Sequence, residues 1–219
     1  KMKRICMARV RGLCVLDVDG TLIEEEVIDL LGRQAACEQE VANLTTQAMQ
    51  GKLDFESSLR KRVSLLQGLS VSVFNQVYSQ VHFSKNVQDF IKILQEHGIV
   101  CGLVSGGFTQ IVGKLAHELG INYFVANQLE VKDGILTGNL VGDVVTAQVK
   151  EETLKSWARQ LEVPLDKTIV VGDGANDLYM LKSAGIGIAF CAKDILKKEI
   201  PLQIEERDFT KVLELIDFF

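Results

Sequence analysis

The hydrophobic positions of the chain form short apolar runs that alternate with longer amphipathic stretches. Apolar runs with the length of buried strands occupy residues 13–19, 99–104, 123–126, 168–171 and 186–190. Amphipathic stretches with helical spacing lie between them, at residues 86–97, 108–119, 150–161 and 178–184. Strands that alternate with helices in this way predict an α/β fold with a parallel sheet.

The segment from residue 23 to residue 83 has a different pattern, because it is helical throughout and contains no proline. Four apolar stripes follow one another along it, so we predict an insertion of about four helices after the first strand. Further along the chain, Lys-Asp-Gly at residues 132–134 predicts a β-hairpin turn. Asp208 is the expected N-cap of a last helix that runs through Ile216.

Composition limits the classes of protein that this chain can belong to. The chain has 219 residues, of which 47% are hydrophobic, so it can bury a substantial core. Its net charge of -5 argues against general binding of nucleic acid. No stretch resembles a signal peptide or a membrane span, so we expect a soluble cytoplasmic protein. The five cysteines are Cys6, Cys14, Cys37, Cys101 and Cys191. Because their number is odd and no two form a Cys-x-x-Cys pair, the sequence indicates neither a disulfide framework nor a zinc site.

Two of these cysteines, Cys14 and Cys101, lie inside apolar runs and are expected to be core thiols.

The most informative polar segment is Asp-Val-Asp-Gly-Thr at residues 17–21, directly after the first apolar run. Residues two apart on a strand share a side, so Asp17 and Asp19 are expected to lie close together. Two neighbouring carboxylates raise each other's pKa unless a cation intervenes, and Mg²⁺ is the cation that best suits carboxylate oxygen.

Two further polar motifs directly follow predicted strands. Ser105, Gly106 and Gly107 offer a hydroxyl and backbone N–H groups at an expected helix N-terminus, which is a suitable site for an anion. Asp173 and Asp177 add two more carboxylates. Ligands of an open parallel sheet bind beyond the carboxyl ends of its strands, so all three motifs are expected to converge there around a metal ion.

Three charged residues outside these motifs have competing interpretations. Lys150, at the expected start of a helix, is either an ordinary exposed lysine or the positive charge that a phosphate site needs. Arg62 shares an apolar stripe with Phe55 and Leu59, so its partner is either a substrate carboxylate or a structural salt bridge. Glu26 follows Glu24 and Glu25 at the expected start of a helix, where acidic residues interact favourably with the helix dipole. On composition alone, this explains its presence without a functional role.

Together these motifs resemble the haloacid dehalogenase superfamily of phosphotransferases. Residues 17–21 are similar to its first motif, Ser105 to its second, Lys150 to its third and residues 172–177 to its fourth. Residues 48–55, 58–63 and 105–109 also resemble the phosphoserine phosphatase family within that superfamily. The resemblance implies a Rossmann-like core of residues 1–22 and 84–219 and a four-helix cap domain of residues 23–83.

The resemblance also implies a role for each site residue. Asp17 is expected to be the nucleophile and Asp19 the general acid and base, with Ser105 and Lys150 as further catalytic residues. The expected ligands of one Mg²⁺ ion are Asp17, Asp19 through its carbonyl, Asp173 and Asp177. Glu26 would bind the substrate ammonium and Arg62 its carboxylate. The other expected substrate-binding residues are Met49, Phe55, Ser105, Gly106, Lys150 and Asn176.

The expected function is therefore Mg²⁺-dependent hydrolysis of phosphoserine through an aspartyl-phosphate, which implies a role in serine biosynthesis. The expected partner is a small phosphorylated amino acid, without nucleic acid or membrane, and the protein is expected to be a monomer or homodimer. One alternative is a superfamily phosphatase or phosphomutase that acts on another small phosphate ester. A phosphorylated switch similar to a receiver domain is a second alternative, and Asp19 and the helical insertion count against it. A catalytically inactive binding protein is a third, and the complete set of charged motif positions counts against that.

Overall fold

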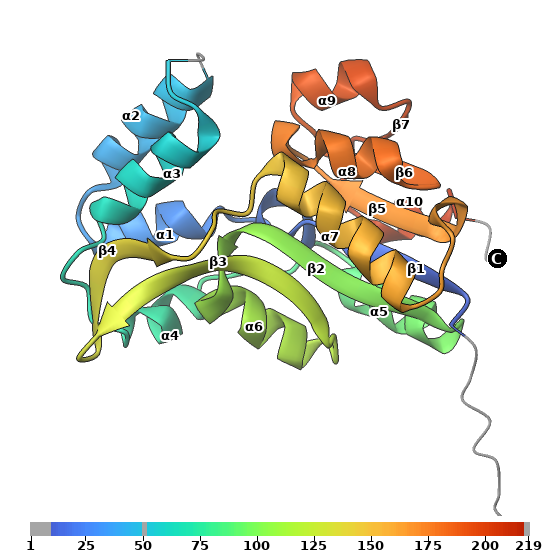
Figure 1. The fold of residues 1–219 in the computed structure, drawn as a ribbon, viewed down its shortest axis with the longest axis horizontal. Coiled ribbons are helices and arrows are strands. Elements are labelled where there is room, and N and C mark those ends of the chain that lie inside the picture. Colours follow the sequence, from blue (N-terminus) through green and yellow to red (C-terminus); the bar gives the residue numbers. More distant parts are fainter. Residues whose placement is uncertain (1–9, 50–51, 217–219) are drawn as a thin grey trace, which may run out of the picture.

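A seven-stranded sheet forms the centre of the molecule, with strand order β4-β3-β2-β1-β5-β6-β7 (Figure 1). The computed structural model describes residues 10–49 and 52–216, without the side chain of Met49. All neighbouring strands pair in parallel except β3 and β4, which pair antiparallel. The strands are β1 (Gly12–Leu16), β2 (Ile99–Phe108), β3 (Tyr123–Lys132), β4 (Ile135–Val141), β5 (Thr168–Gly172), β6 (Ile186–Phe190) and β7 (Leu202–Ile204). The α/β fold with a mainly parallel sheet is therefore confirmed.

Helices cover both faces of this sheet, because each strand directs alternate side chains to opposite sides. In β1, Cys14 and Leu16 pack on the side of α5 (Val87–Glu96), α6 (Thr109–Glu118) and α10 (Phe209–Leu213). Leu13 and Val15 pack on the side of α7 (Ala147–Gln160), α8 (Leu178–Ser183) and α9 (Asp194–Glu199). Burial of Cys14 and Cys101 confirms the prediction that they are core thiols.

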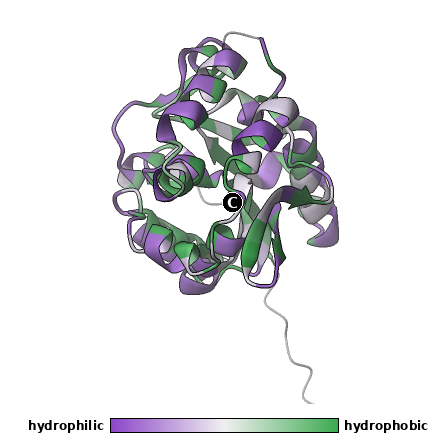
Figure 2. Cartoon of the chain, turned by 90° about the vertical axis from the view of Figure 1, so that its left-hand side faces the viewer, coloured by the Kyte–Doolittle hydropathy of each residue, from purple (hydrophilic) through white to green (hydrophobic). Residues whose placement is uncertain are grey.

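The segment that follows β1 contains four helices, as the apolar stripes predict. They are α1 (Val27–Gln34), α2 (Glu38–Met49), α3 (Phe55–Ser64) and α4 (Val73–Tyr78). The turn after α3 is attached to the edge strand β4, because Gly68 N donates to Leu136 O at 2.9 Å and Leu136 N donates to Leu69 O at 2.8 Å. Figure 2, viewed from this side, shows helices with mixed hydrophilic and hydrophobic residues, as expected where one side of each helix faces a core.

Several boundaries differ from the sequence prediction. The first strand ends at Leu16 rather than at residue 19, and Val18–Leu22 forms a tight turn in which Gly20 has a φ of 73°. We refer to residues 18–22 as the catalytic turn, because they include Asp19, for which the resemblance implies the role of general acid and base. Strand β2 continues to Phe108, so the Ser-Gly-Gly segment at 105–107 belongs to the strand and not to the helix N-terminus. The sequence pattern also missed α9 and β7, which are only six and three residues long.

Other local predictions are confirmed. The hairpin between β3 and β4 turns at Asp133 and Gly134, whose φ angles are 51° and 75°. Asp208 caps α10, because its carboxylate accepts a hydrogen bond from Thr210 N at 2.9 Å, although the helix ends at Leu213 and not at Ile216. No helix within residues 10–49 and 52–216 is long and apolar enough to cross a membrane.

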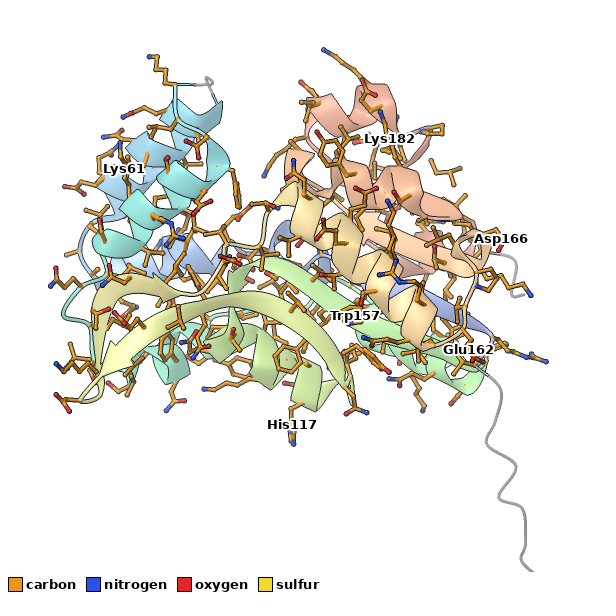
Figure 3. The ribbon with its side chains drawn as sticks, viewed as in Figure 1. Lys61, His117, Trp157, Glu162, Asp166 and Lys182 are labelled. Atoms are coloured by element: carbon orange, nitrogen blue, oxygen red, sulfur yellow. The ribbon has the colours of Figure 1, made fainter. Side chains whose placement is uncertain are left out.

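The contact between β2 and α7 gives a test of the packing. A Cβ atom at Gly102 would lie 2.5 Å from Cζ3 of Trp157, whose rigid indole lies between α7 and β2 (Figure 3). We expect Gly102→Ala to lower the free energy of unfolding by about 1–3 kcal/mol through overpacking. Gly113→Ala in α6 is the matched control, because its Cβ would meet Phe124 at an ordinary 3.6 Å. Urea unfolding should show Gly113→Ala to be neutral or stabilising by up to about 1 kcal/mol, and equal effects of both variants would mean that the indole moves aside without cost.

Candidate active site

The three polar motifs meet beyond the carboxyl ends of adjacent strands β2, β1 and β5. Asp17 directly follows β1, Asp173 directly follows β5, and Ser105 lies near the end of β2. Carboxylate oxygens of Asp17, Asp173 and Asp177 lie within 4.8 Å of one another. All three of these side chains are buried, so the site is a buried acidic cluster at the edge of the sheet.

Lys150 provides the positive charge inside this cluster. Its Nζ donates to Oδ1 of Asp17 and to Oδ1 of Asp177, both at 2.7 Å, and its side chain is 0% exposed. Burial alone lowers the pKa of Lys150, but the charges of Asp17 and Asp177 outweigh burial and raise that pKa above its ordinary value. Lys150 is therefore not an exposed lysine. It also does not open its helix, which begins at Ala147 after the N-cap Thr146.

The remaining negative charge fits a bound cation. Burial, followed by the charge of Asp177, raises the pKa of Asp17 well above its ordinary value despite the opposing charge of Lys150. The same two causes raise the pKa of Asp173 to about 6, while Lys193 opposes them. Three buried carboxylates beside one buried ammonium are thus short of positive charge, and their oxygens are the donors that a hard divalent cation prefers.

Asp19 lies next to this cluster but makes different contacts. Its Oδ2 accepts a hydrogen bond from Val27 N at 3.2 Å, which connects the catalytic turn to the first residue of α1. Its Oδ1 is buried and has no hydrogen-bond partner among the described residues. Burial, followed by the charge of Glu26, raises the pKa of Asp19 well above its ordinary value. An unpartnered buried carboxyl oxygen of this kind is suited to meet a ligand.

The Ser-Gly-Gly segment lies on the other side of Asp19. Ser105 is buried and its Oγ accepts a hydrogen bond from Gly107 N at 2.8 Å. A Cβ atom at Gly107 would lie 3.1 Å from Oδ2 of Asp19, so any larger residue would require this carboxylate to shift. Asn127, which the sequence pattern did not reveal, donates to Gly106 O and accepts from Val145 N, both at 2.8 Å. The sequence signal that could have revealed Asn127 is a polar amide within the otherwise apolar pattern of β3.

The helical insertion brings Phe55 close to this segment. A Cβ atom at Gly106 would lie 3.4 Å from Cζ of Phe55 and 3.6 Å from Nδ2 of Asn176. Residues of α3, β2 and the single 3-10 turn after β5 (Ala175–Asp177) therefore surround one small region. Glu26 precedes α1, and Lys193 Nζ lies 3.6 Å from its Oε1 and 3.8 Å from Oδ2 of Asp173. No sequence motif singled out Lys193. The side chain of Met49 lies outside the described residues.

Arg62 lies in α3 and is half-buried, whereas its neighbour Lys61 is exposed (Figure 3). Its Nε is 3.4 Å from Ser58 O and its Nη1 is 3.5 Å from Oγ1 of Thr45. Burial lowers the pKa of Arg62, although the charge of Glu26 opposes this effect. No carboxylate in the described part of the chain lies within ion-pair distance of Arg62, which argues against the structural salt bridge.

Comparison with known proteins agrees with this geometry. The family model of haloacid dehalogenase-like hydrolases matches residues 14–182. The chain is 52% identical to the phosphoserine phosphatase of Streptococcus thermophilus over 96% of its own length and 98% of that protein. It is 43% identical to the phosphoserine phosphatase of Methanocaldococcus jannaschii over 96% of its own length and 100% of that protein.

Solved structures show the same relationship. A structure described as a phospho-aspartyl intermediate analogue of phosphoserine phosphatase has a TM-score of 0.89 and 43% identity, and the match covers 94% of this chain and 99% of that chain. A substrate-bound phosphoserine phosphatase complex gives the same TM-score, identity and coverage. Since the relatives match almost the whole chain, the protein belongs to the haloacid dehalogenase-like hydrolases and, within them, to the phosphoserine phosphatase family.

Proposed function

We propose that the protein hydrolyses O-phosphoserine to serine and phosphate with the help of Mg²⁺, as a step of serine biosynthesis. The observation that carries this proposal is the environment of Asp17. Its carboxylate is buried directly after the central strand β1, in an acidic cluster where it accepts a hydrogen bond from Lys150. The names of the relatives supply the substrate, and one structural neighbour is a phospho-aspartyl intermediate analogue of such an enzyme. A cytoplasmic location and a monomeric or homodimeric state belong to the same proposal.

Asp17 acts as the nucleophile. One of its oxygens attacks phosphorus, so an O–P bond forms to Asp17 while the bond between phosphorus and the serine oxygen breaks. Lys150 donates to Oδ1 of Asp17, which leaves Oδ2 for the attack and keeps the carboxylate oriented. The positive charge of Lys150 also favours the ionised form of Asp17, which is the reactive form.

Asp19 transfers protons in both halves of the reaction. Its Oδ1 is free of hydrogen bonds within the described residues, and its raised pKa favours the protonated form that a general acid needs. It gives this proton to the departing serine oxygen. The resulting carboxylate then takes a proton from the water that attacks the aspartyl-phosphate, so serine and phosphate are released and Asp17 is restored.

The remaining site residues bind the metal and the phosphate. Asp17, Asp173 and Asp177 would hold Mg²⁺ together with the carbonyl of Asp19. When bound, the ion offsets negative charge on the transferring phosphoryl group. Ser105 and Gly106, with Lys150 and Asn176, would surround the phosphate, which the proximity of Gly106 to Asn176 supports.

The amino-acid end of the substrate faces the helical insertion. Arg62 would bind the substrate carboxylate, because it has no carboxylate partner among the described residues, and Glu26 would bind the ammonium. Phe55 and Met49 would line the pocket. In this proposal residues 23–83 act as a cap domain that excludes bulk water, over a core of residues 1–22 and 84–219.

Replacement of the nucleophile tests the proposed chemistry. Asp17→Asn should lower kcat for phosphoserine by about 10³-fold or more, because an amide cannot form the acyl phosphate. Folding should survive, since the amide oxygen can still accept from Lys150. Phosphate release measures the rate, and Asp166→Asn is the control because Asp166 is exposed and precedes β5, at the opposite end of this strand from Asp173. Parent-like turnover, with deamidation excluded by mass spectrometry, would refute the assignment of Asp17.

The pH dependence tests the role of Asp19. Because its pKa is raised, Asp19 is protonated at a higher pH than an ordinary aspartate, and kcat/KM for phosphoserine should fall as pH rises through that raised pKa. Asp19→Asn should reduce kcat/KM by about 10²–10⁴-fold and remove this limb of the profile. Stopped assays across acidic and mildly basic pH measure both effects, with Glu24→Gln as the exposed control. A limb that persists in Asp19→Asn would mean that another group titrates.

A double-mutant-type cycle tests whether phosphoserine is the substrate. It combines the removal of Arg62 from the protein with the removal of the carboxylate from the substrate. Arg62→Ala should cost about 2–4 kcal/mol in kcat/KM for phosphoserine, because a charged pair is broken in a closed site. Phosphoethanolamine, which lacks the carboxylate, should react poorly with the parent and lose little more. Arg60→Ala is the matched control, since Arg60 lies on the same helix and pairs at the surface with Glu56 at 2.8 Å. Equal losses for both substrates would retain phosphate-ester hydrolysis but reject phosphoserine as the argued target.

A further inference from the structure

Arg207 contacts the catalytic turn from the opposite end of the chain. It lies between β7 and α10 and is half-buried. Its Nη1 donates to Gly20 O at 2.8 Å, although 187 positions separate the two residues, and to Oγ of Ser84 at 3.1 Å. Its guanidinium carbon also lies 5.7 Å from the centroid of the Phe190 ring, which orients the planar group.

Gly20 is the residue of the catalytic turn whose position matters most. A Cβ atom there would lie 2.8 Å from Oδ2 of Asp173, and its φ of 73° is open chiefly to glycine. Its N–H donates to Glu25 O at 3.3 Å, while its carbonyl accepts from Arg207. Because Gly20 directly follows Asp19 and has no room for a Cβ atom beside Asp173, a rotation of its peptide groups would displace both of these carboxyl groups.

Ser84 extends the same contact along the turn. Ser84 Oγ donates to Thr21 O at 2.6 Å, and Ser84 N donates to Leu22 O at 2.9 Å. Arg207 and Ser84 together therefore hold three consecutive carbonyls, those of residues 20, 21 and 22. Ser84 is buried and directly follows the helical insertion, so Arg207 contacts the point at which the insertion rejoins the core.

We propose that Arg207 is a positioning residue for the reaction. Through the carbonyl of Gly20 and the hydroxyl of Ser84, it holds the catalytic turn in the conformation that places Asp19 and Asp173 for catalysis. It does not contact the cluster of Asp17, Asp173 and Asp177 directly, so it acts through the backbone. This inference rests on the proposed function, because Asp19 and Asp173 are catalytic and metal-binding residues only there.

The test compares Arg207→Ala and Arg207→Lys with Lys85→Ala. Lys85 is the matched control, since it pairs with Asp208 at 2.7 Å and so secures the same C-terminal segment without touching Gly20. Arg207→Ala should lower kcat for phosphoserine by about 10- to 100-fold and change KM by less than about threefold, because a displaced acid affects the transition state more than binding. Arg207→Lys should give an intermediate loss, because an ammonium can replace only part of the planar donor group.

Two further readouts separate positioning from general stability. Guanidinium chloride at about 50 mM should restore part of kcat to Arg207→Ala but not to the parent or to Lys85→Ala, because the free ion can occupy the vacated position. The rise in Tm caused by saturating Mg²⁺ should be smaller in Arg207→Ala than in Lys85→Ala, since Asp173 is displaced. Lys85→Ala should lower Tm while it keeps kcat within about twofold of the parent.

Several outcomes would overturn the proposal. They are a parent-like kcat in Arg207→Ala, the absence of rescue by guanidinium, and losses of kcat that simply follow Tm in both Arg207→Ala and Lys85→Ala. If Arg207→Ala does not fold, the same measurements on Arg207→Lys test whether Arg207 positions the catalytic turn. A parent protein without activity on phosphoserine would reject the proposed function instead, and the Mg²⁺-dependent Tm of each variant would still test Arg207.

Discussion

The burial of Lys150 between Asp17 and Asp177 is the interaction on which the site depends. A buried ammonium is tolerated only where carboxylates accept its hydrogen bonds, and here two do so at 2.7 Å. Asp173 joins the same cluster without an equivalent buried cation, since its neighbour Lys193 is 3.8 Å away and about half exposed. The cluster is therefore left with excess negative charge, which explains why it is suited to a divalent cation.

The surrounding fold makes this concentration of charge possible. Parallel strands β1 and β5 are neighbours and end at the same edge, so Asp17 and Asp173 leave the sheet side by side. Glycines then allow the acids to approach the backbone closely: a Cβ atom at Gly172 would lie 2.7 Å from Cγ of Asp177, closer than packing permits. Side chains other than hydrogen at these positions would push the carboxylates apart.

The helical insertion is connected to the same edge at several points. Val27 N binds Asp19, Phe55 lies beside Gly106, and Ser84 binds the carbonyls of Thr21 and Leu22. Val27 lies in the insertion and Ser84 directly follows it, so the two ends of the insertion contact the catalytic turn, which contains Asp19. The C-terminal segment takes part through Arg207, so the two ends of the described chain meet at one turn.

The sequence by itself determined the α/β class, the helical insertion and the place of Asp17 and Asp173 directly after strands, whereas Ser105 lies within β2. These features follow from local periodicity and from the direction of parallel strands, which short stretches of sequence encode. The burial of Lys150 could not be predicted, because it depends on carboxylates 133 and 27 positions away. Asn127 and Arg207 were hidden for the same reason. Strand β7 is too short to show a period, and only its pairing with β6 makes it a strand. The tertiary structure therefore decided every contact whose partners are distant in sequence.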